Sequence, residues 1–279
     1  MKRASRWRIA AASVTGSSHV RLSLPCQDTA TAKVFHDADD KEVLVVVVSD
    51  GAGSASRAEI GSSIACSTVA EAAEVYFAGG NRLEALELDV AISWLQMVQK
   101  AIAIRAAEDI GTPRDYACTL LVAVVGQDSS AIMQIGDGAI VVSDGAGWSW
   151  VHWPQRGEFA NTTFFATDEQ AEKRMAFDFC KGRIEEIAVF SDGIEPLVLE
   201  YTTQTVFAPF FDKMFPAVRA LQEEGLDQGL STALATYLDS PAICARTDDD
   251  KTLVLATRAN AAAVPPLQDS VIPSEDTDE

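Results

Sequence analysis

The feature that most restricts how this chain can fold is a run of apolar residues, Leu-Val-Val-Val-Val at 44–48, inside the segment 42–49. A strand with one face in water alternates apolar and polar residues, whereas this run is apolar and mostly β-branched at every position. We therefore expect a strand at 42–49 that is buried on both of its faces.

The rest of the chain shows strand-like and helical patterns in separate blocks. Ser56 and Glu59 have the spacing of a capping box, which predicts the start of the first long helix. Strands in blocks and helices in pairs differ from the steady alternation of a doubly wound parallel sheet and favour antiparallel sheets with helices packed outside. The expected elements, in order, are strands at 8–14, 29–35 and 42–49, helices at 56–77 and 86–107, strands at 117–125, 131–135, 139–142 and 148–153, an irregular polar loop or flap at 155–182, a strand at 187–190, helices at 209–224 and 228–238, and a strand at 252–256.

The charge balance excludes several classes of function. The 279 residues include 22 Lys and Arg against 41 Asp and Glu, which gives a formal net charge of −19. Nucleic acids and anionic membranes are bound mainly through basic residues, so we expect neither as a partner. The segment 259–279 contains five acidic residues, three prolines and no basic residue. We predict one folded domain over 1–258 and a disordered acidic tail over 259–279.

Cysteine and histidine residues limit the kind of metal site. The five cysteines are far apart and form no Cys-x-x-Cys pair, and only three histidines accompany them. A structural zinc site therefore has little support, and any metal is expected to be held by oxygen. Lone cysteines suit a reducing interior, and no signal peptide or membrane-spanning stretch is recognisable, so we expect a cytoplasmic protein.

Two strands that are expected to be buried end in the same tripeptide, Ser-Asp-Gly, at 49–51 and 191–193. A carboxylate at such a place is costly unless a positive group meets it. Asp-Gly is also a common turn dipeptide, and Asp144, between two strands of an expected hairpin, fits that simpler interpretation. Asp50 and Asp192 are not followed directly by a second strand, which favours a role as ligands.

Further carboxylates lie next to strands. Asp137 lies between two expected strands, and the run 248–250 consists of three aspartates directly before the last strand. Each of them alone is more often a solvated loop charge. Together with Asp50 and Asp192 they predict an oxygen-ligated Mg²⁺ or Mn²⁺ site, the kind of site that usually acts on phosphate.

These segments, in this order, resemble the metal-dependent Ser/Thr protein phosphatases of the protein phosphatase 2C (PPM) type, in their bacterial form. The resemblance implies an α+β fold, a four-layer α-β-β-α sandwich of two central antiparallel sheets flanked by paired helices. It spans most of the chain and rests on Pro25-Cys26-Gln27-Asp28, Ser49-Asp50-Gly51-Ala52-Gly53, Ile135-Gly136-Asp137-Gly138, Ser191-Asp192-Gly193 and Asp249-Asp250-Lys251-Thr252.

The resemblance implies a centre of two Mn²⁺ or Mg²⁺ ions with a possible third. Asp50 would bridge the two ions and the Gly51 carbonyl would bind one of them. Asp192 and Asp249 would complete the other, and Asp137 would help to hold the third.

The resemblance also implies the reaction. A water bridging the two metals would hydrolyse phosphoserine and phosphothreonine esters in proteins, with Asp28 and Asp50 as the catalytic residues and Asp28 acting through metal-bound water. No covalent intermediate is needed, so Cys26 is given no nucleophilic role. The implied partners are a phosphorylated protein substrate and a cognate Ser/Thr kinase in a signalling system.

Some positions depart from the family pattern. Ala52 stands where many relatives carry a histidine that protonates the leaving oxygen, and Ser23 stands where an arginine commonly binds phosphate. His19 and Arg21 are the substitutes expected to bind the substrate phosphate, with Arg57 as a third possibility. The alternative hypothesis is a catalytically weak pseudo-phosphatase that acts as a binding or regulatory module. A simple metal-binding protein would explain the carboxylates but not their order.

Overall fold

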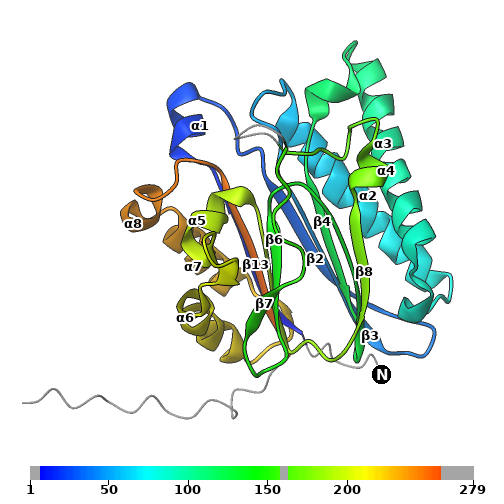
Figure 1. The fold of residues 1–279 in the computed structure, drawn as a ribbon, viewed down its shortest axis with the longest axis vertical. Coiled ribbons are helices and arrows are strands. Elements are labelled where there is room, and N and C mark those ends of the chain that lie inside the picture. Colours follow the sequence, from blue (N-terminus) through cyan, green and yellow to red (C-terminus); the bar gives the residue numbers. More distant parts are fainter. Residues whose placement is uncertain (1–6, 158–162, 259–279) are drawn as a thin grey trace, which may run out of the picture.

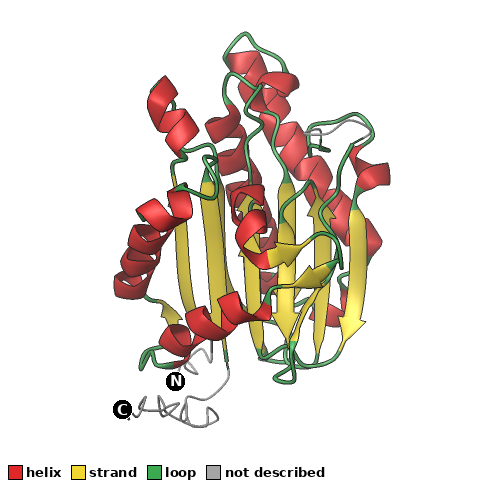
Figure 2. Ribbon diagram, turned by 60° about the vertical axis from the view of Figure 1, so that its left-hand side comes forward, coloured by secondary structure: helices red, strands yellow, loops and turns green. Residues whose placement is uncertain are grey.

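The computed structural model of the chain describes residues 7–157 and 163–258. Two sheets lie face to face, and helices cover the outer face of each (Figure 1, Figure 2). The predicted four-layer α-β-β-α sandwich is confirmed. The predicted tail at 259–279 and part of the predicted flap lie outside the described residues.

Antiparallel pairing dominates both sheets, and among the described residues only the short pair of β1 and β12 is parallel. The five-stranded sheet has the order β2 (Thr29–His36), β3 (Glu42–Ser49), β4 (Leu120–Val125), β5 (Ser129–Ile135) and β8 (Ala176–Lys181). The six-stranded sheet has the order β12 (Gly225–Leu226), β1 (Arg8–Val14), β13 (Lys251–Thr257), β9 (Glu186–Phe190), β6 (Ala139–Ser143) and β7 (Trp148–Trp150), and a small hairpin pairs β10 (Leu199–Glu200) with β11 (Thr205–Val206).

Helices form the two outer layers. The long helices α2 (Ala58–Ala78) and α3 (Leu88–Glu108) cover the five-stranded sheet, with the short α4 (Ala171–Arg174) beside them (Figure 1). On the other side lie α5 (Glu195–Val198), α6 (Ala208–Arg219), α7 (Gln228–Leu238) and α8 (Pro241–Cys244), while α1 (Ser17–Leu22) stands at one end of the sandwich. No helix of the described residues is long and apolar enough to cross a bilayer.

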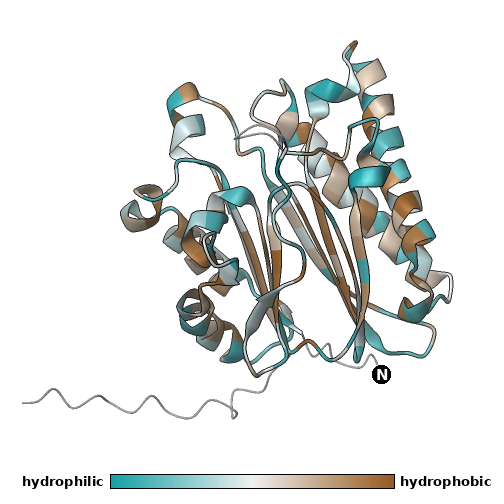
Figure 3. Cartoon of the chain, viewed as in Figure 1, coloured by the Kyte–Doolittle hydropathy of each residue, from teal (hydrophilic) through white to brown (hydrophobic). Residues whose placement is uncertain are grey.

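The strand β3 confirms the prediction made from its apolar run. Side chains of successive residues point to opposite faces of a sheet. Val43, Val45 and Val47 belong to the core under α2 and α3, whereas Leu44 and Val48 belong to the core between the two sheets. Every one of these side chains is at most 1% exposed, and the apolar colouring of the strands in Figure 3 shows the same interior.

Two local expectations were wrong. Ser56 does not cap the first long helix: its hydroxyl donates to Asp115, and Arg57 occupies the N-cap position without a side-chain cap. The segment 155–182, expected to be irregular, contains α4 and the edge strand β8. That strand alternates over only a few residues, Phe177 and Phe179 facing the core and Asp178 and Cys180 exposed, which is a short signal within a polar segment.

Candidate active site

The registers of the strands bring the proposed ligands to one end of the sandwich. Phe190, at the end of β9, pairs with Ala139 on one side and with Leu253 on the other. The loops that hold Asp137, Asp192 and the aspartates 248–250 therefore meet there. Ser49 pairs with Thr29 across the sheet, which places Asp28 and Asp50 next to each other at the same end.

Three carboxylates form the centre of this end. One oxygen from each of Asp50, Asp137 and Asp192 lies within 4.8 Å of the others. Asp28 lies beside them, only 6% exposed, and its Oδ2 accepts a 2.6 Å hydrogen bond from the Ser191 hydroxyl. The backbone supports the cluster, because the Asp50 amide donates to Thr119 Oγ1 at 2.9 Å.

The electrostatics of this cluster favour a bound cation. Burial raises the pKa of Asp28 to about 6, although the hydrogen bond from Ser191 acts in the opposite direction. Burial also raises the pKa of Asp50 and Asp192 well above the usual value, and the charges of neighbouring aspartates add to both shifts. Four carboxylates that are this close repel one another unless they share protons or a cation.

The donor set fits Mg²⁺ or Mn²⁺. Asp28 Oδ1 and Asp192 Oδ1 are buried and accept no hydrogen bond. Within residues 7–157 and 163–258, no Lys or Arg forms an ion pair with the carboxylates of Asp28, Asp50, Asp137 or Asp192. Such oxygens are the ligands that hard divalent cations prefer.

Close backbone packing holds the loops of the site together. A Cβ added to Gly193 would lie 1.9 Å from the Asp250 carbonyl oxygen. A Cβ added to Gly51 would lie 2.7 Å from Ala58 Cβ at the start of α2. Gly51 after Asp50 and Gly193 after Asp192 therefore have packing roles that the Ser-Asp-Gly motif alone does not reveal.

The two last aspartates of the run 248–250 have different surroundings. Asp250 is 2% exposed and accepts hydrogen bonds from the amides of Gly16 at 2.6 Å and Gln27 at 2.5 Å, so it ties three segments together. Asp249 is exposed and lies outside the group of three, yet its charge contributes to the raised pKa of Asp192. The sequence motif did not predict the structural role of Asp250.

The basic residues that the sequence offered for phosphate binding have protein partners. His19 Nδ1 lies 2.9 Å from Asp250 Oδ2, and Arg21 lies 3.1 Å from the exposed carboxylate of Asp248. Arg57 donates to Tyr116 at 3.0 Å and stacks over its ring, near the start of α2. The side chain of Arg57 is therefore already bound to Tyr116 in the outer helical layer.

The Cys26 thiol is a poor nucleophile. Burial raises its pKa to about 12, and the charges of Asp28 and Asp250 act in the same direction. A thiolate is the reactive form of cysteine, so this environment keeps the side chain inert.

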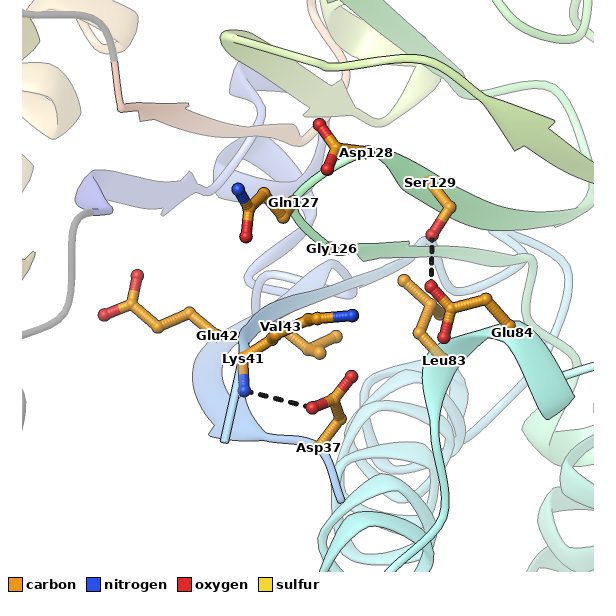
Figure 4. A pocket seen from close by; sticks show the side chains of 10 residues that line it. All are labelled: Asp37, Lys41, Glu42, Val43, Leu83, Glu84, Gly126, Gln127, Asp128 and Ser129. Atoms are coloured by element: carbon orange, nitrogen blue, oxygen red, sulfur yellow. Dashed lines mark hydrogen bonds between the residues drawn. The ribbon is translucent and has the colours of Figure 1, made fainter. Parts of the chain in front are cut away.

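A polar pocket lies at the opposite end of the sandwich, where the chain enters β3 and turns from β4 into β5 (Figure 4). Its polar groups largely serve one another: the Lys41 amide donates to Asp37 at 3.0 Å, and Ser129 donates to Glu84 at 3.3 Å. The pocket is thus separate from the carboxylate cluster, which follows the other end of β3.

Known proteins share both the sequence and the fold. The family model described as protein phosphatase 2C matches residues 15–239. Serine/threonine-protein phosphatase 3 of Escherichia coli (strain K12) is 38% identical over 250 residues, which cover 90% of this chain and 98% of that protein.

Two solved structures share the fold at low sequence identity. Serine/threonine phosphatase Stp1 from Staphylococcus aureus has a TM-score of 0.56 and 16% identity, covering 92% of this chain and 97% of that one. The catalytic domain of the serine threonine protein phosphatase PstP, in complex with 2 manganese ions, has a TM-score of 0.57 and 15% identity, covering 90% and 97%. With a matching family model and a relative of this identity, the chain belongs to the protein phosphatase 2C family.

Proposed function

We propose that this protein hydrolyses phosphoserine and phosphothreonine esters in proteins with the help of Mn²⁺ or Mg²⁺. The observation that carries the proposal is the group of three carboxylates within 4.8 Å in a chain of the protein phosphatase 2C family. The relative from Escherichia coli is named as a Ser/Thr protein phosphatase, and the solved structure of PstP holds manganese, which supports the same reaction and the same kind of metal.

The proposed centre would hold two ions, with a possible third. Asp50 and the Gly51 carbonyl would hold these ions together with Asp192 and Asp249. Asp137 would help to hold the third. Divalent cations in such a centre acidify water and neutralise the charge that develops on the phosphoryl oxygens.

The chain's own residues orient the reactants. Asp28 accepts a proton from the attacking water, and the hydroxyl of Ser191 fixes one oxygen of Asp28 while the other stays without a partner. Water attacks phosphorus, the bond from phosphorus to the ester oxygen breaks, and the leaving oxygen takes a proton from water because Ala52 cannot supply one. Contact of His19 and Arg21 with the substrate phosphate stays a prediction.

The wider setting follows from the same reaction. We propose that residues 1–258 form the catalytic domain, that 259–279 is an acidic tail dispensable for catalysis, and that the protein works in the cytoplasm in a signalling system with a Ser/Thr kinase. A chain that ends at residue 258 should keep its melting temperature and its activity on a small phosphate ester. A large loss of either would contradict the assignment of the tail.

Hydrolysis of p-nitrophenyl phosphate and of a phosphothreonine peptide, with and without Mn²⁺, tests the function. We expect activity that EDTA abolishes and Mn²⁺ restores. Asp50→Asn should be folded and inactive, and Mn²⁺ should no longer raise its melting temperature. Asp144→Asn, which alters an exposed turn between β6 and β7, is the matched control and should behave as wild type. Activity that survives exhaustive chelation would refute the proposal.

A further inference from the structure

A phosphate that approaches this site meets a strongly anionic surrounding. The cluster itself consists of carboxylates, and the whole chain has a formal charge of −19. Metal ions offset part of this charge. The usual protein group for binding a phosphate is an arginine, whose planar guanidinium donates two parallel hydrogen bonds to two phosphoryl oxygens. The sequence has serine at position 23, where the family resemblance implies an arginine.

The backbone next to Arg156 is fixed against the cluster. The Gln155 amide donates to the Gly136 carbonyl at 3.0 Å, and the Gln155 side chain accepts from the Gly136 amide at 3.0 Å. Gln155 Nε2 also donates to the Arg174 carbonyl at 2.9 Å. Because Gly136 directly precedes Asp137, these bonds fix the chain at Arg156 beside one of the three clustered carboxylates.

The side chain of Arg156 is oriented by two further residues. Its Cζ lies 4.5 Å from the centre of the Tyr201 ring, and its Nη2 lies 3.6 Å from Glu195 Oε2. The Tyr201 hydroxyl donates to the same carboxylate. Glu195 is only 4% exposed and begins α5, three residues after Asp192, so this support belongs to the wall of the site.

The Arg156 guanidinium is exposed enough to donate to a ligand. The Arg156 side chain is 58% exposed, and its partners among residues 7–157 and 163–258 are the ring face of Tyr201 and one oxygen of Glu195 at ion-pair distance. Glu195 Oε1 is buried without a hydrogen-bond partner, so this arrangement is not explained by a saturated structural salt bridge. By contrast, His19 is held by Asp250 and Arg21 pairs with Asp248.

We propose that Arg156 binds the phosphoryl group of the substrate beside the carboxylate cluster, and that Glu195 and Tyr201 are positioning residues for its guanidinium. This inference rests on the phosphatase function proposed above. Arg156 would thus supply the phosphate contact that Ser23 cannot make.

Two measurements on the Mg²⁺-loaded protein test the role of Arg156: kcat/KM for p-nitrophenyl phosphate, and the affinity for inorganic phosphate by calorimetry. Arg156→Ala should lower both by about tenfold to a hundredfold, the effect of losing hydrogen bonds to a charged group. Arg156→Lys should recover part of the loss, because it keeps the charge without the fork. Arg174→Ala removes an equal charge from an exposed side chain that stacks on Phe164, and should match wild type.

Glu195→Gln tests the positioning role by the sign of its effect. Removing a negative charge beside the site would by itself strengthen phosphate binding. If Glu195 positions Arg156, phosphate affinity should instead fall severalfold while Mg²⁺ affinity stays unchanged. A gain in phosphate affinity would overturn the positioning role.

Wild-type kinetics and phosphate affinity in Arg156→Ala would overturn the inference, and so would a loss found in Arg21→Ala but not in Arg156→Ala. If wild type shows no metal-dependent hydrolysis at all, the proposed function fails. The phosphate calorimetry still decides whether Arg156 binds the anion, so the two failures are distinguishable.

Discussion

At the scale of single residues, glycines decide how closely the loops of the site can pack. Gly193 separates Asp192 from the start of α5 and faces the Asp250 carbonyl, whose oxygen would lie 1.9 Å from an added Cβ. The obstacle is backbone, which cannot rotate away as a long side chain can. Any larger residue at position 193 has to push apart the two loops that hold Asp192 and Asp249.

We expect Gly193→Ala to lower the free energy of unfolding by about 3 kcal/mol, at the upper end for overpacked sites. Mn²⁺ affinity should fall as well, because the loops carry proposed ligands. Urea unfolding and calorimetry measure the two effects. Gly53→Ala, whose added Cβ meets nothing within 4 Å, is the control and should stay within about 0.5 kcal/mol of wild type. Equal effects of the two variants would show that the close approach is unimportant.

Glu195 should make stability depend on pH in the metal-free protein. Burial raises its pKa from 4.5 to about 7, against the hydrogen bond from Tyr201. The folded state therefore holds the proton more tightly than the unfolded state. This stabilisation is complete below pH 4.5 and is lost as the pH rises through 7, a change on the order of 3 kcal/mol.

The comparison with Glu195→Gln isolates this effect, because glutamine does not titrate. Urea unfolding of both proteins from pH 4.5 to 8 should show wild type losing stability relative to the variant as the pH rises. A constant difference would mean that folding does not raise the pKa of Glu195, and wild type gaining relative stability would mean that folding favours the charged carboxylate.

The sequence predicted the carboxylates of the site more completely than the residues that hold these carboxylates and their loops in place. Asp50 and Asp192 follow strands whose burial is visible in the sequence, so their unusual placement could be inferred. Asp250 and Ser191 could not be assigned in that way. Their partners, Gly16 and Asp28, are 234 and 163 residues away in the chain, and only the packed fold brings them together.

At the scale of elements, the predictions succeeded where burial dominates and failed where local contacts decide. The strand β3 is apolar on both faces and its bounds were predicted correctly. The edge strand β8 does alternate, with Phe177 and Phe179 packed against the core under α2 and α3 and Asp178 and Cys180 exposed, but the alternation is too short to stand out in a polar segment. Such a short strand depends on its pairing with β5, which the sequence alone does not reveal.

Helix caps give a test at this scale. Ser56 has the spacing of a cap but donates to Asp115, whereas Asp227 caps α7 by accepting a 2.6 Å hydrogen bond from the Leu230 amide. Asp227→Ala should therefore lower the free energy of unfolding by about 1 kcal/mol, and Ser56→Ala should change it by less than about 0.5 kcal/mol. Chemical denaturation of both variants decides the matter. A larger loss of stability in Ser56→Ala than in Asp227→Ala would support the capping box predicted from the sequence.

At the scale of the whole molecule, net charge acts on every substrate before it reaches the site. A formal charge of −19 repels phosphate esters at distances beyond direct contact, and only the metals and nearby basic groups such as Arg156 act against that field. Phosphopeptides with basic residues beside the phosphate are attracted by the same field. The overall charge thus favours basic substrate segments without any specific pocket for them.

Ionic strength separates this long-range effect from contacts within the site. Raising NaCl from about 0.02 M to 0.3 M shortens the screening length from roughly 20 Å to below 8 Å and weakens the field outside the site. The value of kcat/KM should then rise for a phosphothreonine peptide with acidic flanking residues and fall for one with basic flanking residues. A peptide with neutral flanks controls for effects of salt on the metal centre. Parallel responses of all three peptides would mean that contacts inside the site, and not the charge of the whole molecule, govern which phosphoproteins are preferred.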